Sequence, residues 1–214
     1  MKRRTLMTAA AGTATAALAG CLGDATAPGS ENGDSGEDGD WTSDSIRDHF
    51  GGEPTRPECE RESETVTVNR GDETEQRETA ETIPYPDPPS SFDDEAVLDY
   101  VESFEAAYVR HDAICESSDA ILEVAYSVEN SEALDLDGEA TAVYLYYAGG
   151  ASSGVTEDGI EWAADLGFRG VVYGVDETGT ARAQVPDEQG ADPRGLVEQL
   201  PELLDDGKLV ATFE

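Results

Sequence analysis

The sequence predicts an α+β fold in which one long helix packs on an antiparallel sheet. Between Val97 and Cys115, apolar side chains recur every three or four residues, which is the spacing of one face of a helix. Beyond this stretch, runs rich in β-branched and aromatic residues alternate with turn residues such as Asp176-Glu-Thr-Gly179. Such runs are typical of strands joined as hairpins.

The segment that precedes the long helix predicts one strand and two stretches without regular structure. Residues 64–68 alternate apolar and polar side chains, as a half-buried strand does. Residues 69–81 are polar and predict a loop, and the proline-rich residues 84–89 predict an extended lead-in. Ser91 or Asp93 is expected to cap the helix.

Beyond the long helix we expect a sheet, a short helix and a last strand. Residues 121–128 and 140–147 predict an antiparallel pair with Asp137-Gly138 in the turn, and 149–161 a loop rich in Gly and Ser. The expected elements after that are a hairpin of 168–175 and 180–185, a helix with Asp192 as its cap and Pro193 first, broken or kinked at Pro201, and a strand over 209–213. A cystatin-like or nuclear-transport-factor-like wrapped sheet fits this order, but a fold by itself implies no function.

The first residues have the layout of a secretory signal. Basic Lys2, Arg3 and Arg4 precede an uncharged apolar stretch of about thirteen residues, too short for a membrane span of about 20 residues. The Arg3-Arg4 pair resembles a twin-arginine export signal, and Leu18-Ala-Gly-Cys21 resembles the lipobox of lipoproteins. The resemblance implies cleavage before Cys21 and a lipid on that residue; the alternative is an ordinary signal with an incidental Cys.

Three parts of the chain are therefore expected. Residues 1–20 form a signal peptide, 21–55 comprise the lipidated Cys and a disordered acidic tether, and 56–214 form a single extracytoplasmic domain. The tether is rich in Gly, Asp, Glu and Ser, a composition that cannot bury enough apolar surface to fold. Trp41, Ile46 and Phe50 form a small apolar group in it, which we interpret as stray tether residues rather than as a docking turn.

The charge of the chain indicates its environment and excludes one class of partner. Its 48 acidic residues against 13 basic ones give a formal net charge of −35. Such a surface repels itself in dilute buffer, while molar salt shortens the Debye length to about 3 Å. This predicts a protein of an extreme halophile, and it argues against nucleic-acid binding because no basic patch would meet the phosphates.

With Cys21 used for lipid, Cys59 and Cys115 remain as an even pair in an oxidising compartment. We expect a disulfide between them; two free buried thiols are the alternative.

No motif predicts a catalytic, cofactor or metal site. Gly150-Ala-Ser-Ser-Gly154 matches a nucleophile elbow around Ser152, but both histidines, His49 and His111, come earlier in the chain than the elbow requires. His111 lies on the apolar stripe of the helix and is expected to be structural, and the Cys and His inventory is too small for zinc. The acidic stretch 135–139 has the wrong register for a calcium loop.

Five tyrosines could line a binding groove, although aromatic residues on strands more often pack across strands. They are Tyr126, Tyr144, Tyr146, Tyr147 and Tyr173.

Three segments are similar to haloarchaeal lipoproteins of unknown function that carry twin-arginine signals. They are Arg56-Pro-Glu-Cys-Glu60, Tyr85-Pro-Asp-Pro-Pro89 and Tyr108-Val-Arg-His-Asp112 with Cys115. The resemblance implies export, a lipid on Cys21 and an acidic surface, and it assigns no activity.

We therefore predict a non-enzymatic, lipid-anchored protein on the outer face of the cell membrane, with a binding or envelope-interaction role and no cofactor. The alternatives are a lipoprotein that captures a solute or a metal ion, and an unrecognised enzyme.

Overall fold

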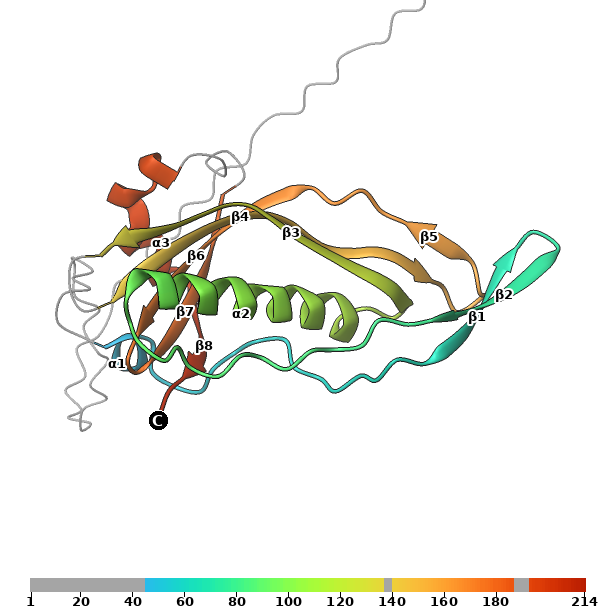
Figure 1. Ribbon diagram of the computed structural model, residues 1–214, viewed down its shortest axis with the longest axis horizontal. Coiled ribbons are helices and arrows are strands. Elements are labelled where there is room, and N and C mark those ends of the chain that lie inside the picture. The colour runs from blue at the N-terminus through green and yellow to red at the C-terminus, as the bar shows by residue number, and fades with distance from the viewer. Residues whose placement is uncertain (1–44, 137–139, 187–192) are drawn as a thin grey trace, which may run out of the picture. The chain divides into compact units, whose positions relative to one another are not determined.

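A computed structural model describes residues 45–136, 140–186 and 193–214 of the chain. These residues form the predicted α+β fold, in which a curled antiparallel sheet holds a helix against it (Figure 1). The elements, in chain order, are α1 (Ile46–Phe50), β1 (Thr65–Arg70), β2 (Glu73–Glu78), α2 (Asp94–Cys115), β3 (Ala120–Asp135), β4 (Thr141–Val155), β5 (Glu161–Ala163), β6 (Phe168–Asp176), β7 (Gly179–Val185), the 3-10 turns η2 (Pro193–Gly195) and η3 (Val197–Gln199), α3 (Leu200–Asp205) and β8 (Lys208–Thr212).

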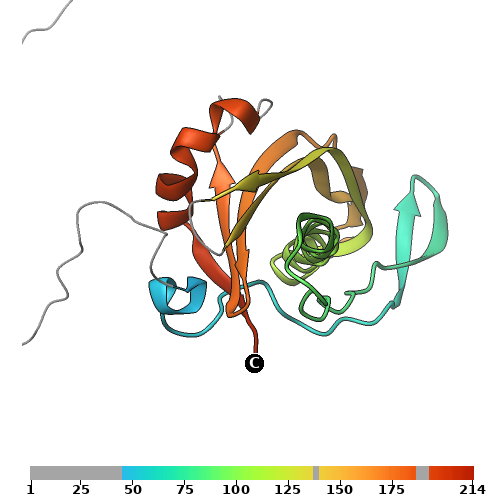
Figure 2. The same cartoon turned by 60° about the vertical axis from the view of Figure 1, so that its left-hand side comes forward.

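The main sheet is antiparallel throughout, with the strand order β3-β4-β6-β7-β8 and with β5 added to β4. Figure 2 looks nearly along α2 and shows the sheet curving round that helix. The pairing of β3 with β4 and the β6–β7 hairpin were predicted from the sequence. The predicted turn at Asp137-Gly138 lies outside the described residues.

Helix α2 is the long helix that the periodicity predicts. Of the two expected caps, Asp93 is the residue at the N-cap, and its side chain accepts a hydrogen bond from the backbone N–H of Ala96 at 3.1 Å. The apolar stripe packs on the concave face of the sheet, where Phe104 is fully buried. Desolvation of this stripe is the main driving force that holds the helix on the sheet.

The opposite face of the sheet is covered over β6, β7 and β8 by α1 and α3, which makes this part of the sheet buried on both sides. Ile46 is fully buried there, and its backbone N–H donates to the Asp176 carboxylate at 2.7 Å. The backbone N–H of Thr55 donates to the carbonyl of Leu209 in β8 at 2.8 Å. The expectation that Ile46 and Phe50 are stray tether residues is therefore wrong, and the packed chain begins before the expected boundary at residue 56; Trp41 lies outside the described residues.

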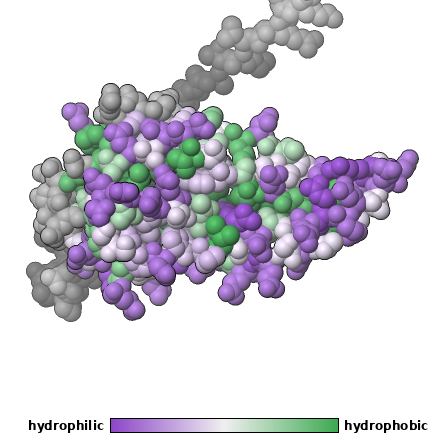
Figure 3. All heavy atoms as spheres, in the orientation of Figure 1, coloured by the Kyte–Doolittle hydropathy of each residue, from purple (hydrophilic) through white to green (hydrophobic). Residues whose placement is uncertain are grey.

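Two segments predicted as loops are strands. Residues 73–78 form β2, which pairs with β1 as a hairpin although almost all its side chains are exposed and polar (Figure 3). Within the expected loop 149–161, β4 continues to Val155 and β5 begins at Glu161. Cross-strand hydrogen bonding decides both cases, because a backbone paired on a neighbour needs no favourable side-chain pattern.

The C-terminal part follows the prediction with one difference. The expected short helix is divided into η2, η3 and α3, and Pro201 lies in the first turn of α3, where a proline is tolerated. The expected cap, Asp192, is outside the described residues, and the last strand is present as β8.

Among the residues that the structure describes, no helix is both long and apolar enough to cross a membrane. Arg3, Arg4, Cys21 and the tether up to residue 44 lie outside the described part of the chain, so the signal, the lipidation and the tether stay predictions.

Candidate functional site

A buried ion pair lies between α2 and the concave face of the sheet. Glu105 of α2 is completely buried and Arg182 of β7 is 7% exposed. Arg182 donates from Nε to Oε2 of Glu105 at 2.9 Å and from Nη2 to Oε1 at 2.8 Å. Tyr173 of β6 donates its hydroxyl to the same carboxylate. All the polar atoms of Glu105 are thereby satisfied, as a buried charge requires.

The pKa shifts in this cluster follow from burial and from the pair. Burial raises the pKa of the Tyr173 hydroxyl well above its ordinary value, and the negative charge of Glu105 raises it further. For Arg182, desolvation by itself lowers the pKa, but the Glu105 carboxylate more than offsets this and the pKa is raised. The guanidinium therefore stays charged and fixed in place.

This pair was not predicted from the sequence, although one of its two residues left a signal there. Glu105 lies four residues after Val101 and four before Val109, so it belongs to the buried stripe of α2. An acid on such a stripe predicts a buried partner. The identity of Arg182 as that partner left no sequence signal, because 77 residues separate the two positions.

A pocket of about 510 Å³ opens beside this ion pair, a volume in the range of small-molecule sites. Its walls come from α2, β4, β6, β7 and the turn between α3 and β8. The residues that line it are Tyr108, Val109, Asp112, Ala113, Tyr147, Gly149, Gly150, Ala151, Arg169, Arg182, Ala183, Gln184, Asp206, Gly207 and Lys208.

Two glycines of β4, Gly149 and Gly150, form part of one wall of this pocket. A Cβ atom added at Gly149 would lie 3.1 Å from the rings of Tyr126 and Tyr147. Gly150 has φ of +143°, a conformation that favours glycine. The Gly149-Gly150 pair was interpreted as loop composition. Glycines inside a strand instead mark a close approach or a bend, and here they flank the pocket.

Three of the thirteen basic residues of the chain line the pocket: Arg169, Arg182 and Lys208. Among the described residues, neither Arg169 nor Lys208 forms an ion pair with a carboxylate. Two acids, Asp112 and Asp206, lie in the same lining and are exposed. Because Glu105 balances the charge of Arg182, Arg169 and Lys208 are, within the described part of the chain, the two lining cations without a bonded carboxylate, in a chain whose net charge is −35.

The aromatic ring of Tyr108 lies under two of these cations. Cζ of Arg182 is 4.2 Å from the ring centroid and Nζ of Lys208 is 5.3 Å from it. Both distances are within the range of cation–π attraction. The ring therefore attracts both cations; the charge of Arg182 is balanced by Glu105, whereas Lys208, among the residues described, has only the ring.

Two further tyrosines, Tyr147 and Tyr126, pack side by side with their ring centroids 5.3 Å apart. Burial raises the pKa of each hydroxyl, and the Glu105 carboxylate adds to the effect. The hydroxyl of Tyr126 is buried and has no hydrogen-bond partner within the described structure. Both phenols are therefore neutral at ordinary pH.

The five tyrosines proposed as one groove divide between the two faces of the sheet. Tyr126, Tyr147 and Tyr173 belong to the core cluster on the α2 side, and Tyr144 and Tyr146 to the cluster on the α3 side. A single groove lined by all five does not exist, because successive residues of a strand point to opposite faces.

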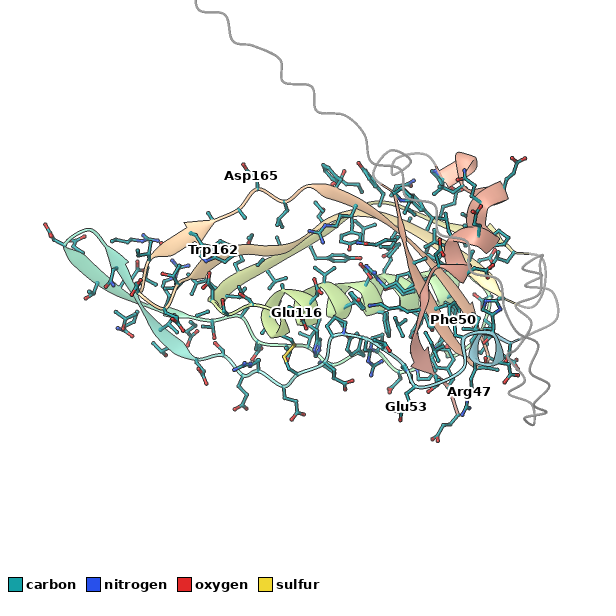
Figure 4. The ribbon with its side chains drawn as sticks, turned by 180° about the vertical axis from the view of Figure 1, so that it is seen from behind. Arg47, Phe50, Glu53, Glu116, Trp162 and Asp165 are labelled. Atoms are coloured by element: carbon teal, nitrogen blue, oxygen red, sulfur yellow. A yellow bond between two sulfur atoms is a disulfide. The ribbon has the colours of Figure 1, made fainter. Side chains whose placement is uncertain are left out.

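A second polar corner lies at the end of α2, where the structure confirms the predicted Cys59–Cys115 disulfide (Figure 4). His111 is 5% exposed, in agreement with the structural role predicted for it. Its Nε2 lies 2.8 Å from the carbonyl oxygen of Ile83, and its Nδ1 lies 3.9 Å from Sγ of Cys115. The backbone N–H of Cys59 points to Nδ1 at 3.5 Å.

The other motif residues fall elsewhere. Ser152 lies in β4 and donates its hydroxyl to the carbonyl of Glu123 at 3.3 Å. His49 follows Ile46 in α1 and its Nε2 lies 3.0 Å from the Asp205 carboxylate. The nucleophile, the two histidines and the acidic stretch are thus not brought together, and most of the stretch 135–139 lies outside the described residues.

No protein-family model matches the chain, and no curated protein or solved structure is significantly similar to it.

Proposed function

We propose that this chain is a lipid-anchored protein on the outer face of the cell membrane, and that its domain binds a small organic anion in the pocket between α2 and the sheet. The anchor part is supported by the basic start, the apolar stretch and Cys21 in its lipobox-like setting. The acidic composition supports a halophilic cell surface.

The observation that carries the binding part is the meeting of Arg169, Arg182 and Lys208 in one pocket. In molar salt the Debye length is about 3 Å, so charges that lie farther apart than this are largely screened from each other. Only groups that contact a ligand directly then contribute, and a carboxylate placed between guanidinium and ammonium groups makes charge-assisted hydrogen bonds.

Binding is favoured over acid–base catalysis by the state of the ionisable groups. The Glu105 carboxylate is occupied by Arg182 and Tyr173. The raised pKa values of Tyr147 and Tyr173 make these hydroxyls poor proton donors to a reaction near neutral pH, where a catalytic group has its pKa near the working pH. Tyr108 and Tyr147 instead supply aromatic walls to the pocket.

The test is a thermal-shift screen of the full-length protein at about 1 M salt, followed by calorimetry of the ligands found. The panel contains small mono- and dicarboxylates, inorganic phosphate and sulfate, with neutral sugars and amines as controls. A carboxylate present at about 100 times its Kd would stabilise the fold by about 2.7 kcal/mol. For a domain of this size the Tm would then rise by roughly 5–10 °C.

Two variants connect the shift to the pocket. Lys208→Met removes a pocket cation, and loss of one charged hydrogen bond is expected to weaken binding by roughly ten- to a hundredfold. Arg47→Gln removes an exposed arginine of α1 outside the pocket and should leave binding unchanged. A screen in which no anion shifts the Tm, or equal weakening by both variants, would refute the proposed site.

A further inference from the structure

The corner at the end of α2 brings together three atoms that are ligands for soft metal ions. The two sulfur atoms of Cys59 and Cys115 and a ring nitrogen of His111 all lie within 4.8 Å of one another. Figure 4 shows this corner beside the end of α2, near Glu116. With the disulfide formed, the sulfur atoms have no thiolate to offer.

The hydrogen bonds of His111 determine which of its nitrogens faces the sulfurs. The carbonyl oxygen of Ile83 can only accept, so Nε2 carries the proton of the neutral ring. Nδ1 then carries the lone pair of the ring; it accepts the backbone N–H of Cys59 at 3.5 Å and lies 3.9 Å from Sγ of Cys115, so a metal ion at Nδ1 would displace that N–H. A metal-binding histidine normally has this arrangement, with its other nitrogen donating to a backbone carbonyl or a carboxylate.

The ring is also held in position by its neighbours. Tyr85 stacks on His111 with ring centroids 4.8 Å apart and an interplanar angle of 21°. Cζ of Arg56 lies over the Tyr85 ring, 4.0 Å from its centroid. The Tyr85 hydroxyl donates to the Pro57 carbonyl at 2.6 Å, next to Cys59. The imidazole is therefore preorganised, while the sulfur atoms and the Cys59 backbone N–H must move to admit an ion.

Cys59 and His111 also line a pocket of about 790 Å³ that leads to solvent. Its lining includes the carboxylates of Glu58, Glu60, Glu62 and Glu81 together with two arginines. An ion at the corner would thus have an open position toward water and carboxylates, beside its three protein ligands.

We propose that reduction of the Cys59–Cys115 disulfide turns this corner into a site for one thiophilic divalent cation such as Zn²⁺, held by both thiolates and Nδ1 of His111. The geometry fits tetrahedral zinc, in which Zn–S is about 2.3 Å and Zn–N about 2.0–2.1 Å, so that sulfur and nitrogen are about 3.6 Å apart. The observed separation of Sγ and Nδ1 is 3.9 Å.

A dithiol reductant supplies two electrons and two protons to the disulfide, is itself oxidised to a disulfide, and leaves two protein thiols. Binding of Zn²⁺ then releases the two thiol protons, one from Cys59 and one from Cys115. His111 loses no proton, because the proton on Nε2 stays on the hydrogen bond to Ile83. The oxidised protein therefore offers no thiolate to a metal ion, whereas the reduced protein offers two.

The experiment uses the full-length protein, oxidised or reduced with a phosphine under anaerobic conditions, and titrates it with Co²⁺ as a spectroscopic probe and then with Zn²⁺. The expected result is one Co²⁺ per reduced chain, with a thiolate-to-cobalt charge-transfer band that Zn²⁺ abolishes, and no such band for oxidised protein. Zinc at about 100 times its Kd should raise the Tm of reduced protein by roughly 5–10 °C, and a chelator should reverse this.

His111→Gln should weaken Zn²⁺ binding at least tenfold, whereas His49→Gln, the change of the other histidine, should leave it unchanged. Circular dichroism of each oxidised variant establishes that it is folded before reduction. Failure of reduced protein to bind one equivalent of metal, equal binding by oxidised protein, or equal affinity of His111→Gln and wild type would overturn the proposal. A reduced chain that unfolds and is not restored by Zn²⁺ would overturn it as well.

Discussion

Replacement of Glu105 by Gln tests the importance of the buried ion pair to the fold. The substitution keeps the shape of the side chain and removes its charge. Arg182, which is 7% exposed, then holds a guanidinium charge away from water without a counter-charge. Tyr173 also exchanges a charged acceptor for a neutral one.

The expected cost is large compared with the stability of a domain. Removal of one partner of a buried pair costs about 3–5 kcal/mol, and whole domains are stable by about 5–15 kcal/mol. With a urea m-value of about 2 kcal/mol/M, the unfolding midpoint should fall by roughly 1.5–2.5 M. The pair is buried, so its contribution should persist in molar salt, unlike that of a surface pair.

Urea unfolding followed by tryptophan fluorescence and far-UV circular dichroism measures this effect at several salt concentrations. Asp99→Asn on the exposed side of α2 is the matched control and should change stability by less than about 0.5 kcal/mol. A triple replacement, Glu105→Leu with Arg182→Met and Tyr173→Phe, should recover most of the loss, because an apolar cluster of similar volume needs no charge compensation. A cost below about 1 kcal/mol for Glu105→Gln, or one that vanishes in molar salt, would refute the reasoning.

Three further predictions concern the disulfide, the pH response and the anchor. Replacing Cys59 and its partner by Ser opens a cross-link of sequence separation 56 and should lower stability by roughly 4 kcal/mol, measured by urea unfolding with and without reductant; equal midpoints would contradict this. Burial raises the pKa of Tyr100 to about 12, against smaller opposite effects of Thr180 and Arg56. Because the pKa is raised in the folded state, the contribution of this neutral tyrosine to stability is fully present below pH about 10. That contribution is lost as the pH rises toward 12, by up to about 1.4 kcal/mol per pH unit for each such tyrosine. The tyrosinate absorbance of Tyr100 should therefore appear together with the loss of the circular dichroism signal. Ionisation of Tyr100 near pH 10 in a protein that stays folded would contradict this prediction. Intact mass spectrometry of membrane-derived protein should find the chain starting at a lipid-modified Cys21, whereas an unprocessed start would remove the basis for the export hypothesis.

The sequence by itself determined the elements whose signals are local. Helix α2 and its cap at Asp93 follow from a periodic apolar stripe and a side chain that satisfies an N–H three residues away. The β6–β7 hairpin follows from a short turn, and Asp176 there accepts bonds from the backbone N–H groups of Thr178 and Gly179. The disulfide followed from counting the cysteines of a chain predicted to be exported to an oxidising compartment.

Tertiary structure decided everything that depends on partners distant in the chain. The polar strand β2 and the Gly- and Ser-rich end of β4 are strands because a neighbouring backbone pairs with them, which no local pattern encodes. Ile46 belongs to the core rather than to a tether, because it packs on the face of the sheet opposite α2.

The candidate sites were decided in the same way. Glu105 could be recognised from the sequence as an acid on a buried stripe, but its pairing with Arg182 required the curl of the sheet round α2. Three basic residues of an acidic chain came to line one pocket because distant segments pack together. His111 and Cys115 are neighbours on one face of α2, but Cys59 reaches them from a segment 52 residues before His111. The reason is physical: local propensity fixes where elements form, while burial and cross-strand hydrogen bonds, summed over the whole fold, fix which side chains meet.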